Sequence, residues 1–251
     1  MSYLIAIDIG NTNITVGIFE KGHLIQKTKM PTKEHPLYER RLKSFIERCE
    51  LNTKNVEETI ISSVVPLALR RLLHALKKIV KGNVSIIGKD IKVPINNRYR
   101  IKKEVGQDRL VNAFAAKVIY GSPCVIIDFG TAMTFDIVSK RGQYLGGLIL
   151  PGIEISLASL YEKTALLPKV KLKDAPYIIG KDTKNSMRGG ILFGFGTMCD
   201  GLVSRYRKIL GKSIKVIATG GNASLMKKYA KSIKIVDKDL TLKGLNLIAP
   251  G

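Results

Sequence analysis

The fold is decided by the stretch Ile7-Asp8-Ile9-Gly10-Asn11-Thr12. The residues before it, Tyr3 to Ile7, are apolar and partly β-branched, which predicts a buried strand, and Asn13 to Phe19 return to the same pattern. A tight turn at Gly10 would leave backbone N–H groups exposed. Such groups, beside a hydroxyl and a carboxylate that can hold a metal, suit the phosphates of a nucleotide. The same residue types are also typical of an ordinary hairpin turn.

A second copy of this pattern is found in Val125-Ile126-Ile127-Asp128-Phe129-Gly130-Thr131. Asp128 follows Asp8 by 120 residues, and the turn Arg141-Gly142 follows Lys21-Gly22 at the same offset. One Asp-x-Gly match could arise by chance, but two aligned turns on one strand pattern predict a duplicated lobe. Two such lobes would hold a nucleotide between their acidic turns, an arrangement that resembles the actin-like, sugar-kinase and Hsp70-type ATPases.

We therefore predict an α/β protein of duplicated actin-like (ribonuclease H-like) lobes, each a mixed sheet flanked by helices. The N-terminal lobe is expected to span residues 1–117 and the C-terminal lobe residues 118–251. The length of 251 residues fits two lobes of this size. No Ser/Gly-rich linker separates the halves, so the connection is expected to be structured.

Local patterns place the elements within each half. Pro66 is a favourable residue for the first turn of a helix, and a long run from Thr183 to Leu210 reads as helical. The strands are expected near 2–9, 13–20, 23–28, 59–64, 84–87, 123–129, 132–139 and 143–149, and the helices near 36–49, 66–80, 110–116, from 153 and 183–210.

Composition predicts a folded, cytoplasmic protein without a membrane partner. Hydrophobic residues make up 45% of the chain and charged residues 25%, which is enough to bury a core. No apolar run reaches the roughly 18–20 residues of a membrane helix. The three cysteines are far apart and form no Cys-x-x-Cys pair, which argues against a zinc ribbon and favours a reducing compartment.

The net charge of +22 is high. It is compatible with a nucleic-acid partner. However, the basic residues are scattered from Lys21 to Lys243 without forming a tail, which is typical of a lysine-rich solvated surface, so a nucleic acid is not the expected partner. A positive field would also attract anionic substrates such as ATP.

The stretch Gly106-Gln107-Asp108-Arg109 is the second candidate for chemistry. Asp108 precedes a helical run, so it is expected either to cap that helix or to act as an acid–base group, with Arg109 as an anion clamp. A positioned carboxylate can accept the proton of an attacking hydroxyl, which is worth roughly 10²–10⁴ in rate. The histidines that could compete for this role stand in ordinary contexts: His23, His35 and His74.

Glycines mark the second half. Gly146-Gly147, Pro151-Gly152 and Thr219-Gly220-Gly221 suggest turns where backbone approaches another group closely. Gly180-Lys181 is not a Walker loop, because the earlier glycine is missing. The helical run contains glycines that permit close helix contact, within the subunit or across a dimer: Gly189, Gly190, Gly194, Gly196 and Gly201.

In their order and spacing these motifs resemble the type III pantothenate kinase family, nearly from end to end. The resemblance implies ATP, Mg²⁺, a monovalent cation (K⁺ or NH₄⁺), and a homodimer whose subunits jointly form the site. It rests on Asp8-x-Gly10-Asn11-Thr12, Gly106-x-Asp108-Arg109 with Asn112 and Ala115-Ala116, Asp128-x-Gly130-Thr131-Ala132-x-Thr134, Gly146-Gly147-x-Ile149-x-Pro151-Gly152, Thr183-x-x-Ser186 and Thr219-Gly220-Gly221.

The resemblance also implies roles for single residues. Asp8 would lie near Mg²⁺, Asp108 would take the proton of the pantothenate hydroxyl, and Asp128 would bind the monovalent cation. The ATP-binding set would be Asp8, Ile9, Gly10, Asn11, Thr12, Asn13, Ile14, Thr15 and Thr131. The pantothenate-binding set would be Tyr99, Gly106, Gln107, Asp108, Arg109 and Thr183.

Two departures from the family pattern affect these roles. Gln107 stands where alanine is often found, which is harmless if its side chain points away. Arg100-Ile101-Lys102 replaces a more usual Asp-Asn-Pro, so the role of Tyr99 stays open.

The predicted reaction is ATP-dependent phosphorylation of pantothenate to 4′-phosphopantothenate, the first step of coenzyme A biosynthesis. Two alternatives remain: a transcriptional accessory, nucleic-acid-binding regulator on the same fold, or an actin-like kinase for another small hydroxyl substrate. The intact Gly106-x-Asp108-Arg109 segment favours an enzyme, because a pure binder needs no placed acid.

Overall fold

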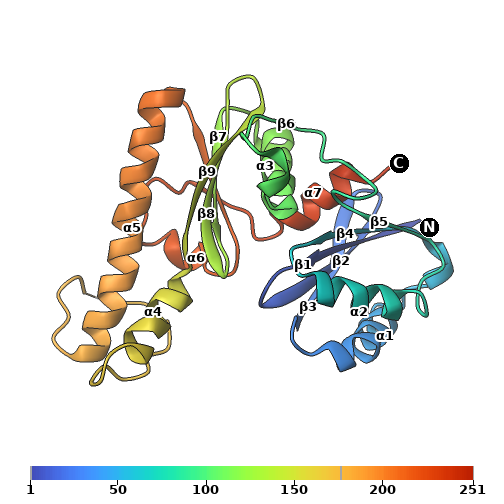
Figure 1. Ribbon diagram of the computed structural model, residues 1–251, viewed down its shortest axis with the longest axis horizontal. Helices are drawn as coiled ribbons and strands as arrows, with labels where there is room; N and C mark the ends of the chain where they lie inside the picture. The colour runs from blue at the N-terminus through green and yellow to red at the C-terminus, as the bar shows by residue number, and fades with distance from the viewer. Residues whose placement is uncertain (1, 176, 251) are drawn as a thin grey trace. The chain divides into compact units, whose positions relative to one another are not determined.

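The computed structural model describes residues 2–175 and 177–250. The chain divides into two compact units (Figure 1). The first comprises the chain up to Ile95, Ile101–Ala115 and the chain from Leu240, and the second comprises Asn96–Arg100 and Ala116–Asp239. A division by compactness does not test where a duplicated sequence begins, so the lobe boundary between residues 117 and 118 stays a prediction.

The first unit contains a five-stranded sheet in the order β3-β2-β1-β4-β5. The first three strands are antiparallel, and β4 and β5 run parallel to β1. Because β1 lies between two neighbours and is covered on both faces, it reads as a continuous apolar run. The strands are β1 (Tyr3–Ile9), β2 (Asn13–Glu20), β3 (His23–Pro31), β4 (Val56–Ser63) and β5 (Asn83–Ile86).

Helices cover both faces of this sheet. Side chains alternate along a strand, so Ile61 packs into the cluster with α1 and α2, while Ile60 packs on the opposite face with α3 and α7. The helices are α1 (Tyr38–Arg48), α2 (Pro66–Leu76), α3 (Gln107–Tyr120) and α7 (Leu240–Ile248), with short 3₁₀ helices at His35–Leu37, Thr53–Asn55 and Lys102–Glu104.

The second unit contains a six-stranded sheet in the order β11-β10-β7-β8-β9-β6. Read from β9 to β11, this order repeats that of the first sheet, and α4 follows β9 as α1 follows β3. The duplicated α/β fold predicted from the sequence is therefore confirmed. The strands are β6 (Asn96–Asn97), β7 (Cys124–Phe129), β8 (Ala132–Val138), β9 (Gln143–Pro151), β10 (Lys215–Thr219) and β11 (Ile235–Val236).

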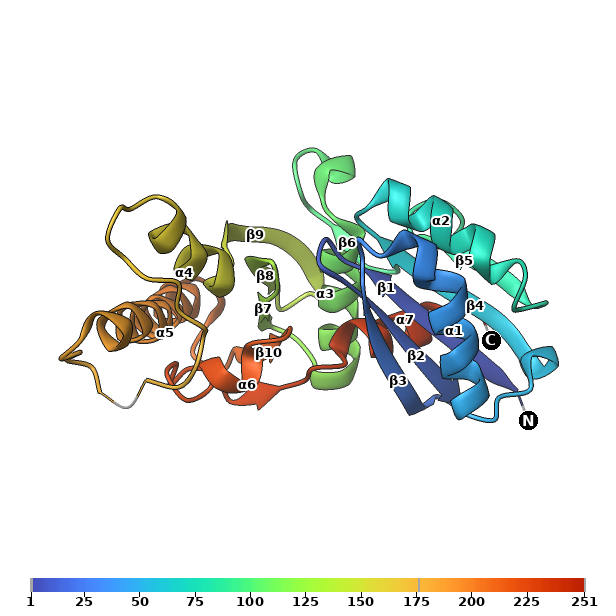
Figure 2. The ribbon, with the colours of Figure 1, turned by 90° about the horizontal axis from the view of Figure 1, so that it is seen from below.

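A long helix without a counterpart in the first unit distinguishes the second. This helix, α5 (Thr183–Leu210), packs beside α4 (Ile153–Glu162), and the short α6 (Ala223–Met226) follows β10 (Figure 2). Leu192, Cys199 and Val203 of α5 join the core of the second sheet. Within residues 2–175 and 177–250, none of the helices has the length and hydropathy that crossing a membrane requires.

Candidate functional site

The first acidic hairpin joins β1 to β2. The Gly10 N–H donates to the Asn13 carbonyl at 3.0 Å, so this donor is used within the turn. Thr32 holds the turn from outside, because its Oγ1 donates to the Gly10 carbonyl at 2.7 Å and its N–H to the Thr12 carbonyl at 2.9 Å. Asn11 is exposed, and its N–H donates to no group in the part of the chain that the structure describes. The turn therefore offers the Asn11 N–H to an anion.

The second acidic hairpin joins β7 to β8 and is one residue shorter, because Ile9 pairs with Ile14 across the first turn and Phe129 pairs with Met133 across the second. A Cβ added at Gly10 would lie 3.3 Å from the Asn13 carbonyl oxygen, and one added at Gly130 would lie 3.3 Å from that of Ala132. Asp128 ends its strand as Asp8 does, and Thr131 is exposed in the turn. The two turns thus share an acid one residue before the end of the strand and a glycine after it, but they differ in length.

Glycines let other backbone segments approach the second hairpin. Gly152 donates its N–H to the Thr131 carbonyl at 3.1 Å, and a Cβ on Gly152 would collide with that same oxygen. Gly220 has a φ of +88°, and a Cβ there would collide with Oδ1 of Asp128. These contacts explain two of the glycine motifs: the backbone must pass directly beside the Thr131 turn and the Asp128 carboxylate.

Each acid is paired in register with a hydroxyl residue on both neighbouring strands. Asp8 is opposite Thr15 of β2 and Ser62 of β4. The equivalent positions around Asp128 are Thr134 of β8 and Thr219 of β10. Ser62 was not predicted from the sequence, because the pairing of β4 with β1 joins residues more than fifty positions apart, and no local pattern shows it.

Asp108 lies in the first turn of α3, one residue inside the helix, so it is not an N-cap. Its Oδ1 accepts the Arg109 N–H at 2.9 Å, and Arg109 is buried. A Cβ on Gly106 would lie 2.5 Å from that Oδ1, so glycine is needed to leave room for the carboxylate. Burial raises the pKa of Asp108, and the hydrogen bond and charge of Arg109 offset this only in part.

The start of α3 lies at the same end of the first sheet as Asp8. The side chain of Gln107 packs against Gly88, which follows the carboxyl end of β5. It therefore makes a contact within the first unit that an alanine at this position could not make. Further along α3, Val111 joins the core cluster of Ala6 and Ile60. Because Asp8 is two residues beyond Ala6 on β1, it faces the side of the sheet that α3 covers.

Tyr99 lies at the edge of the second sheet. Its N–H donates to Asn97 Oδ1 at 2.9 Å, and its ring packs over Gly146, where a Cβ would lie 3.0 Å from the ring. Gly146 has a φ of +109°, and because it has no side chain it leaves room for this ring. The altered residues that follow Tyr99 therefore do not prevent its ring from packing against Gly146 of β9.

Thr183 is the first residue of α5 and is exposed. Asp182 caps the helix by accepting the Asn185 N–H at 2.9 Å. That hydrogen bond holds the pKa of Asp182 below its usual range.

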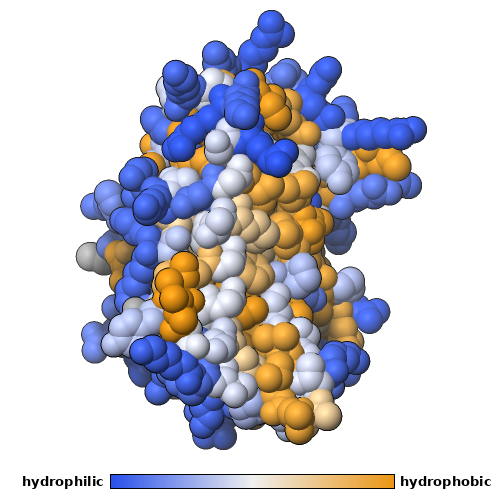
Figure 3. Space-filling view, turned by 90° about the vertical axis from the view of Figure 1, so that its left-hand side faces the viewer, coloured by the Kyte–Doolittle hydropathy of each residue, from blue (hydrophilic) through white to orange (hydrophobic). Residues whose placement is uncertain are grey.

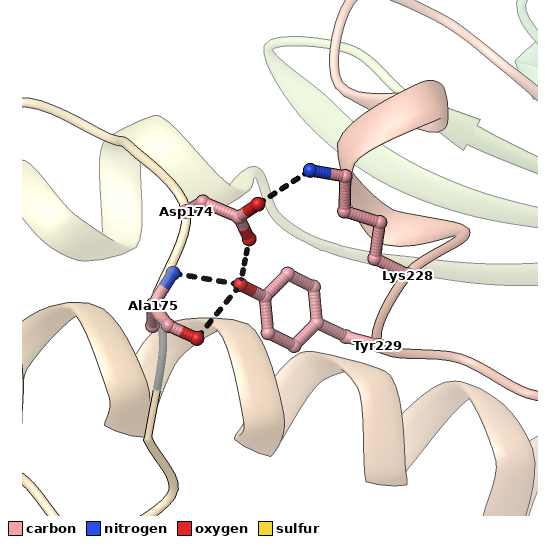
Figure 4. Close-up of polar contacts among 4 residues, drawn as sticks. All are labelled: Asp174, Ala175, Lys228 and Tyr229. Atoms are coloured by element: carbon pink, nitrogen blue, oxygen red, sulfur yellow. Dashed lines mark hydrogen bonds and ion pairs between the residues drawn. The ribbon is translucent and has the colours of Figure 1, made fainter.

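The segment before α5 is anchored to the end of α6 (Figure 4). Ala175 donates its N–H to Tyr229 Oη at 2.7 Å, and this Oη donates to the Asp174 carboxylate. Lys228 bonds the other carboxylate oxygen, and the bonds from Lys228 and Tyr229 hold the pKa of Asp174 low. The Tyr229 ring lies edge-on to Phe193 of α5 at 5.0 Å between centroids. Asp174 and Ala175 are therefore held beside α5 by the segment that follows α6.

Magnesium can fit the first hairpin without a dedicated cage. Among the residues that the structure describes, no three His, Cys, Asp or Glu side chains are grouped to hold a metal ion. A phosphate-bound Mg²⁺ needs only one or two carboxylates, because phosphate oxygens and water complete its shell. Asp8, three residues before the exposed Asn11, is the carboxylate that the first hairpin offers.

The repeated sheet order and the paired acidic hairpins define the class of actin-like ATPase folds, and comparison with solved structures agrees. The chain is similar to a Campylobacter jejuni protein assigned to the Baf family of transcriptional activators (21% identity, 97% of this chain and 96% of that one, TM-score 0.59). It is also similar to component A of (R)-2-hydroxyglutaryl-CoA dehydratase from Acidaminococcus fermentans (15%, 99% and 96%, 0.57). A third match is the inorganic polyphosphate/ATP-glucomannokinase of Arthrobacter sp. strain KM (14%, 98% and 98%, 0.52).

At these identities the solved structures show the fold alone. The family model of type III pantothenate kinase matches residues 4–205, which is most of the chain. The chain belongs to the type III pantothenate kinase family. Membership in a kinase family implies ATP and a divalent metal ion.

Proposed function

We propose that the protein transfers the γ-phosphoryl group of ATP to the primary hydroxyl of pantothenate, giving 4′-phosphopantothenate in the first step of coenzyme A biosynthesis. Family membership supports the reaction class. The observation that carries the proposal is Asp108, a carboxylate of raised pKa in the first turn of α3, on the side of the sheet that Asp8 faces.

Asp108 acts as the general base. Phosphoryl transfer depends mainly on positioning and on neutralising charge, so the acceptor hydroxyl needs one aimed acceptor for its proton. Gly106 leaves space for the carboxylate, and the Arg109 N–H fixes the orientation of its Oδ1. Gln107, Arg109, Tyr99 and Thr183 complete the proposed pantothenate contacts.

The first hairpin binds the phosphates. Asp8 is the carboxylate that would hold Mg²⁺, and the ion would neutralise the charge of the phosphates. The Asn11 N–H donates to a phosphate oxygen, and Thr32 keeps the turn in the shape that exposes this donor. The remaining residues from Ile9 to Thr15 complete the proposed ATP-binding segment, with Ile9 and Ile14 fixing it to the core, and Thr131 contacts the nucleotide.

Asp128 binds a monovalent cation. Cations of this kind prefer carboxylate and carbonyl oxygens. The Gly220 backbone passes beside the Asp128 carboxylate, and the Phe129 carbonyl lies in the same turn. The close approach of Gly220 to the Asp128 carboxylate and the Phe129 backbone supports a cation site at this turn.

The protein forms a homodimer through α5, and the partner contributes to the site. Figure 3 shows apolar side chains gathered on the face that carries this helix. A Cβ added at Gly190, Gly194 or Gly201 would meet no atom of the described residues within 4 Å, so α5 presents a flat strip. Near it Ile178 and Ile209 are 73% and 76% exposed. Flat glycine strips beside exposed apolar residues favour close packing of a second helix.

A coupled assay of ATP consumption tests the function. Turnover with pantothenate is expected to exceed turnover with a panel of sugars and polyols, and to require K⁺ or NH₄⁺ as well as Mg²⁺. A faster rate with any other hydroxyl substrate contradicts the pantothenate assignment but leaves a kinase. No turnover with any acceptor contradicts both.

A nucleic-acid-binding regulator is the second candidate function. Two observations favour it: the net charge of +22, and the fold shared with the Campylobacter jejuni protein. Duplex binding that weakens steeply with salt, in the absence of pantothenate turnover, would support it.

A further inference from the structure

Ser62 of β4 is fully buried, with 0% of its surface exposed, and its Oγ has no hydrogen-bond partner anywhere in residues 2–175 and 177–250. Buried hydroxyls in folded proteins are normally hydrogen-bonded, because losing contact with water is otherwise uncompensated. An exception of this kind asks for an explanation.

The strand register places Ser62 directly beside Asp8. The two residues are Cα partners in the parallel pair of β1 with β4, and neighbouring strands lie about 4.8 Å apart. Their side chains share a face, because Ala6 and Ile60, two residues earlier on the same strands, both pack in the cluster with α3 and α7. The hydroxyl therefore lies within side-chain reach of the Asp8 carboxylate.

The second half of the molecule repeats this arrangement. Thr219 of β10 is the Cα partner of Asp128 in the parallel pair of β10 with β7, and only 2% of its surface is exposed. The two positions share no sequence motif, since Ser62 precedes Ser63 and Thr219 precedes Gly220. A buried hydroxyl beside each acid is thus a feature of the fold.

We propose that Ser62 is a positioning residue of the nucleotide site, whose hydroxyl donates a hydrogen bond to the Asp8 carboxylate when a magnesium–nucleotide complex is bound. The proposal rests on the proposed function, in which Asp8 holds the metal. Metal-ligating carboxylates are themselves usually hydrogen-bonded, which fixes their orientation, and loss of such a partner typically weakens metal affinity by about 10–100-fold. Ser62 does not touch the reacting atoms.

Thr59 offers a matched control on the same strand. Its Oγ1 is also buried at 0% exposure and has no hydrogen-bond partner among the described residues. Thr59 lies on the opposite face of the sheet from Ser62, because it shares the parity of Ile61, which packs with α1 and α2. Thr59→Val therefore removes a hydroxyl of the same kind that does not face Asp8.

The experiment compares Ser62→Ala and Thr59→Val in the full chain. Affinity for a non-hydrolysable ATP analogue is measured by calorimetry over a range of Mg²⁺ concentrations, and the Tm of each free protein is measured beside it. Ser62→Ala is expected to keep or raise the Tm of the free protein, because it removes an unsatisfied hydroxyl. It is expected to weaken the Mg²⁺-dependent part of analogue binding at least tenfold, while Thr59→Val leaves that part unchanged.

Two results would overturn the proposal. One is wild-type Mg²⁺ dependence in Ser62→Ala. The other is a lowered Tm with equal loss of analogue affinity in the presence and absence of Mg²⁺, which is the signature of a purely structural hydroxyl. Failure of the proposed function gives a different result. In that case Asp8→Asn shows the same Mg²⁺ dependence of analogue binding as the wild-type protein.

Discussion

At the scale of single residues, Asp108 is distinguished from an ordinary helix-capping acid by its position. A capping side chain accepts the N–H two or three residues ahead from outside the helix, whereas Asp108 lies inside the first turn and accepts the N–H of Arg109. The helix dipole favours the charged form of Asp108 at this position, yet burial still raises its pKa. A carboxylate kept where burial disfavours its charge is typical of a functional group.

Asp108→Asn is expected to keep the fold and lower kcat by about 10²–10⁴. The amide can accept the Arg109 N–H as the carboxylate does, but it cannot take a proton from the acceptor hydroxyl. Steady-state kinetics with ATP and pantothenate, together with thermal unfolding, measure both effects. A rate near that of the wild-type protein would show that another group is the base.

The raised pKa of Asp108 sets the pH dependence. The base must be ionised, so kcat/KM is expected to fall as pH drops through a value above the ordinary aspartate pKa of about 3.9. Because the native state binds this proton more tightly than the unfolded chain does, the stability contribution is present at low pH. It is lost as pH rises from the ordinary to the raised pKa. A pH profile of unfolding that matches that of Asp108→Asn would refute this.

Asp128→Ala is expected to reduce activation by K⁺ while leaving ATP turnover measurable at high K⁺ concentration. The carboxylate is the charged ligand beside the Gly220 backbone, so its loss weakens the cation site more than it alters the fold. The measurement is the K⁺ concentration for half-maximal activity, with Na⁺ holding the ionic strength constant. Unchanged K⁺ dependence would assign Asp128 another role.

At the scale of secondary structure, local patterns predicted the hairpins but did not predict how distant strands pair. Both acidic turns were visible because strand, turn and strand are adjacent in the sequence. Ser62 was not, and Thr219 was visible only as part of a glycine turn, because the parallel pairing that places each beside an acid joins segments far apart. The Gly10 turn shows the same limit, since Thr32, at the end of β3, holds its carbonyls and no rule for turns could include it.

Helix α5 offers a prediction at this scale. Gly194→Leu is expected to convert a dimer into a monomer, because the new side chain would separate two helices packed at the glycine strip. The stability of the monomer should not fall, since leucine is a better helix former than glycine by roughly 0.5–1 kcal/mol. Sedimentation velocity measures the association state and thermal unfolding the stability. Arg71→Leu, at an exposed position of α2, is the control for an added surface leucine. If the Gly194→Leu protein is still a dimer, the interface does not lie at the glycine strip.

At the scale of the whole molecule, the net charge of +22 affects the two candidate functions differently. A positive field raises the local concentration of any polyanion, so ATP and duplex DNA are both attracted. The sequence shows the magnitude of this charge and its even spread along the chain.

For the kinase, salt is expected to raise the KM for ATP severalfold between about 50 and 200 mM added NaCl at constant K⁺, with little change in kcat, because screening weakens attraction and does not disturb Asp108. Excess duplex DNA should inhibit turnover at low salt only, since binding through six to ten phosphates loses about 10³–10⁵ in affinity over this range. Initial rates with and without DNA at each salt concentration test this. Tight duplex binding that persists at 200 mM NaCl would instead mean that the basic surface recognises nucleic acid specifically, and the regulator would become the better account of the charge.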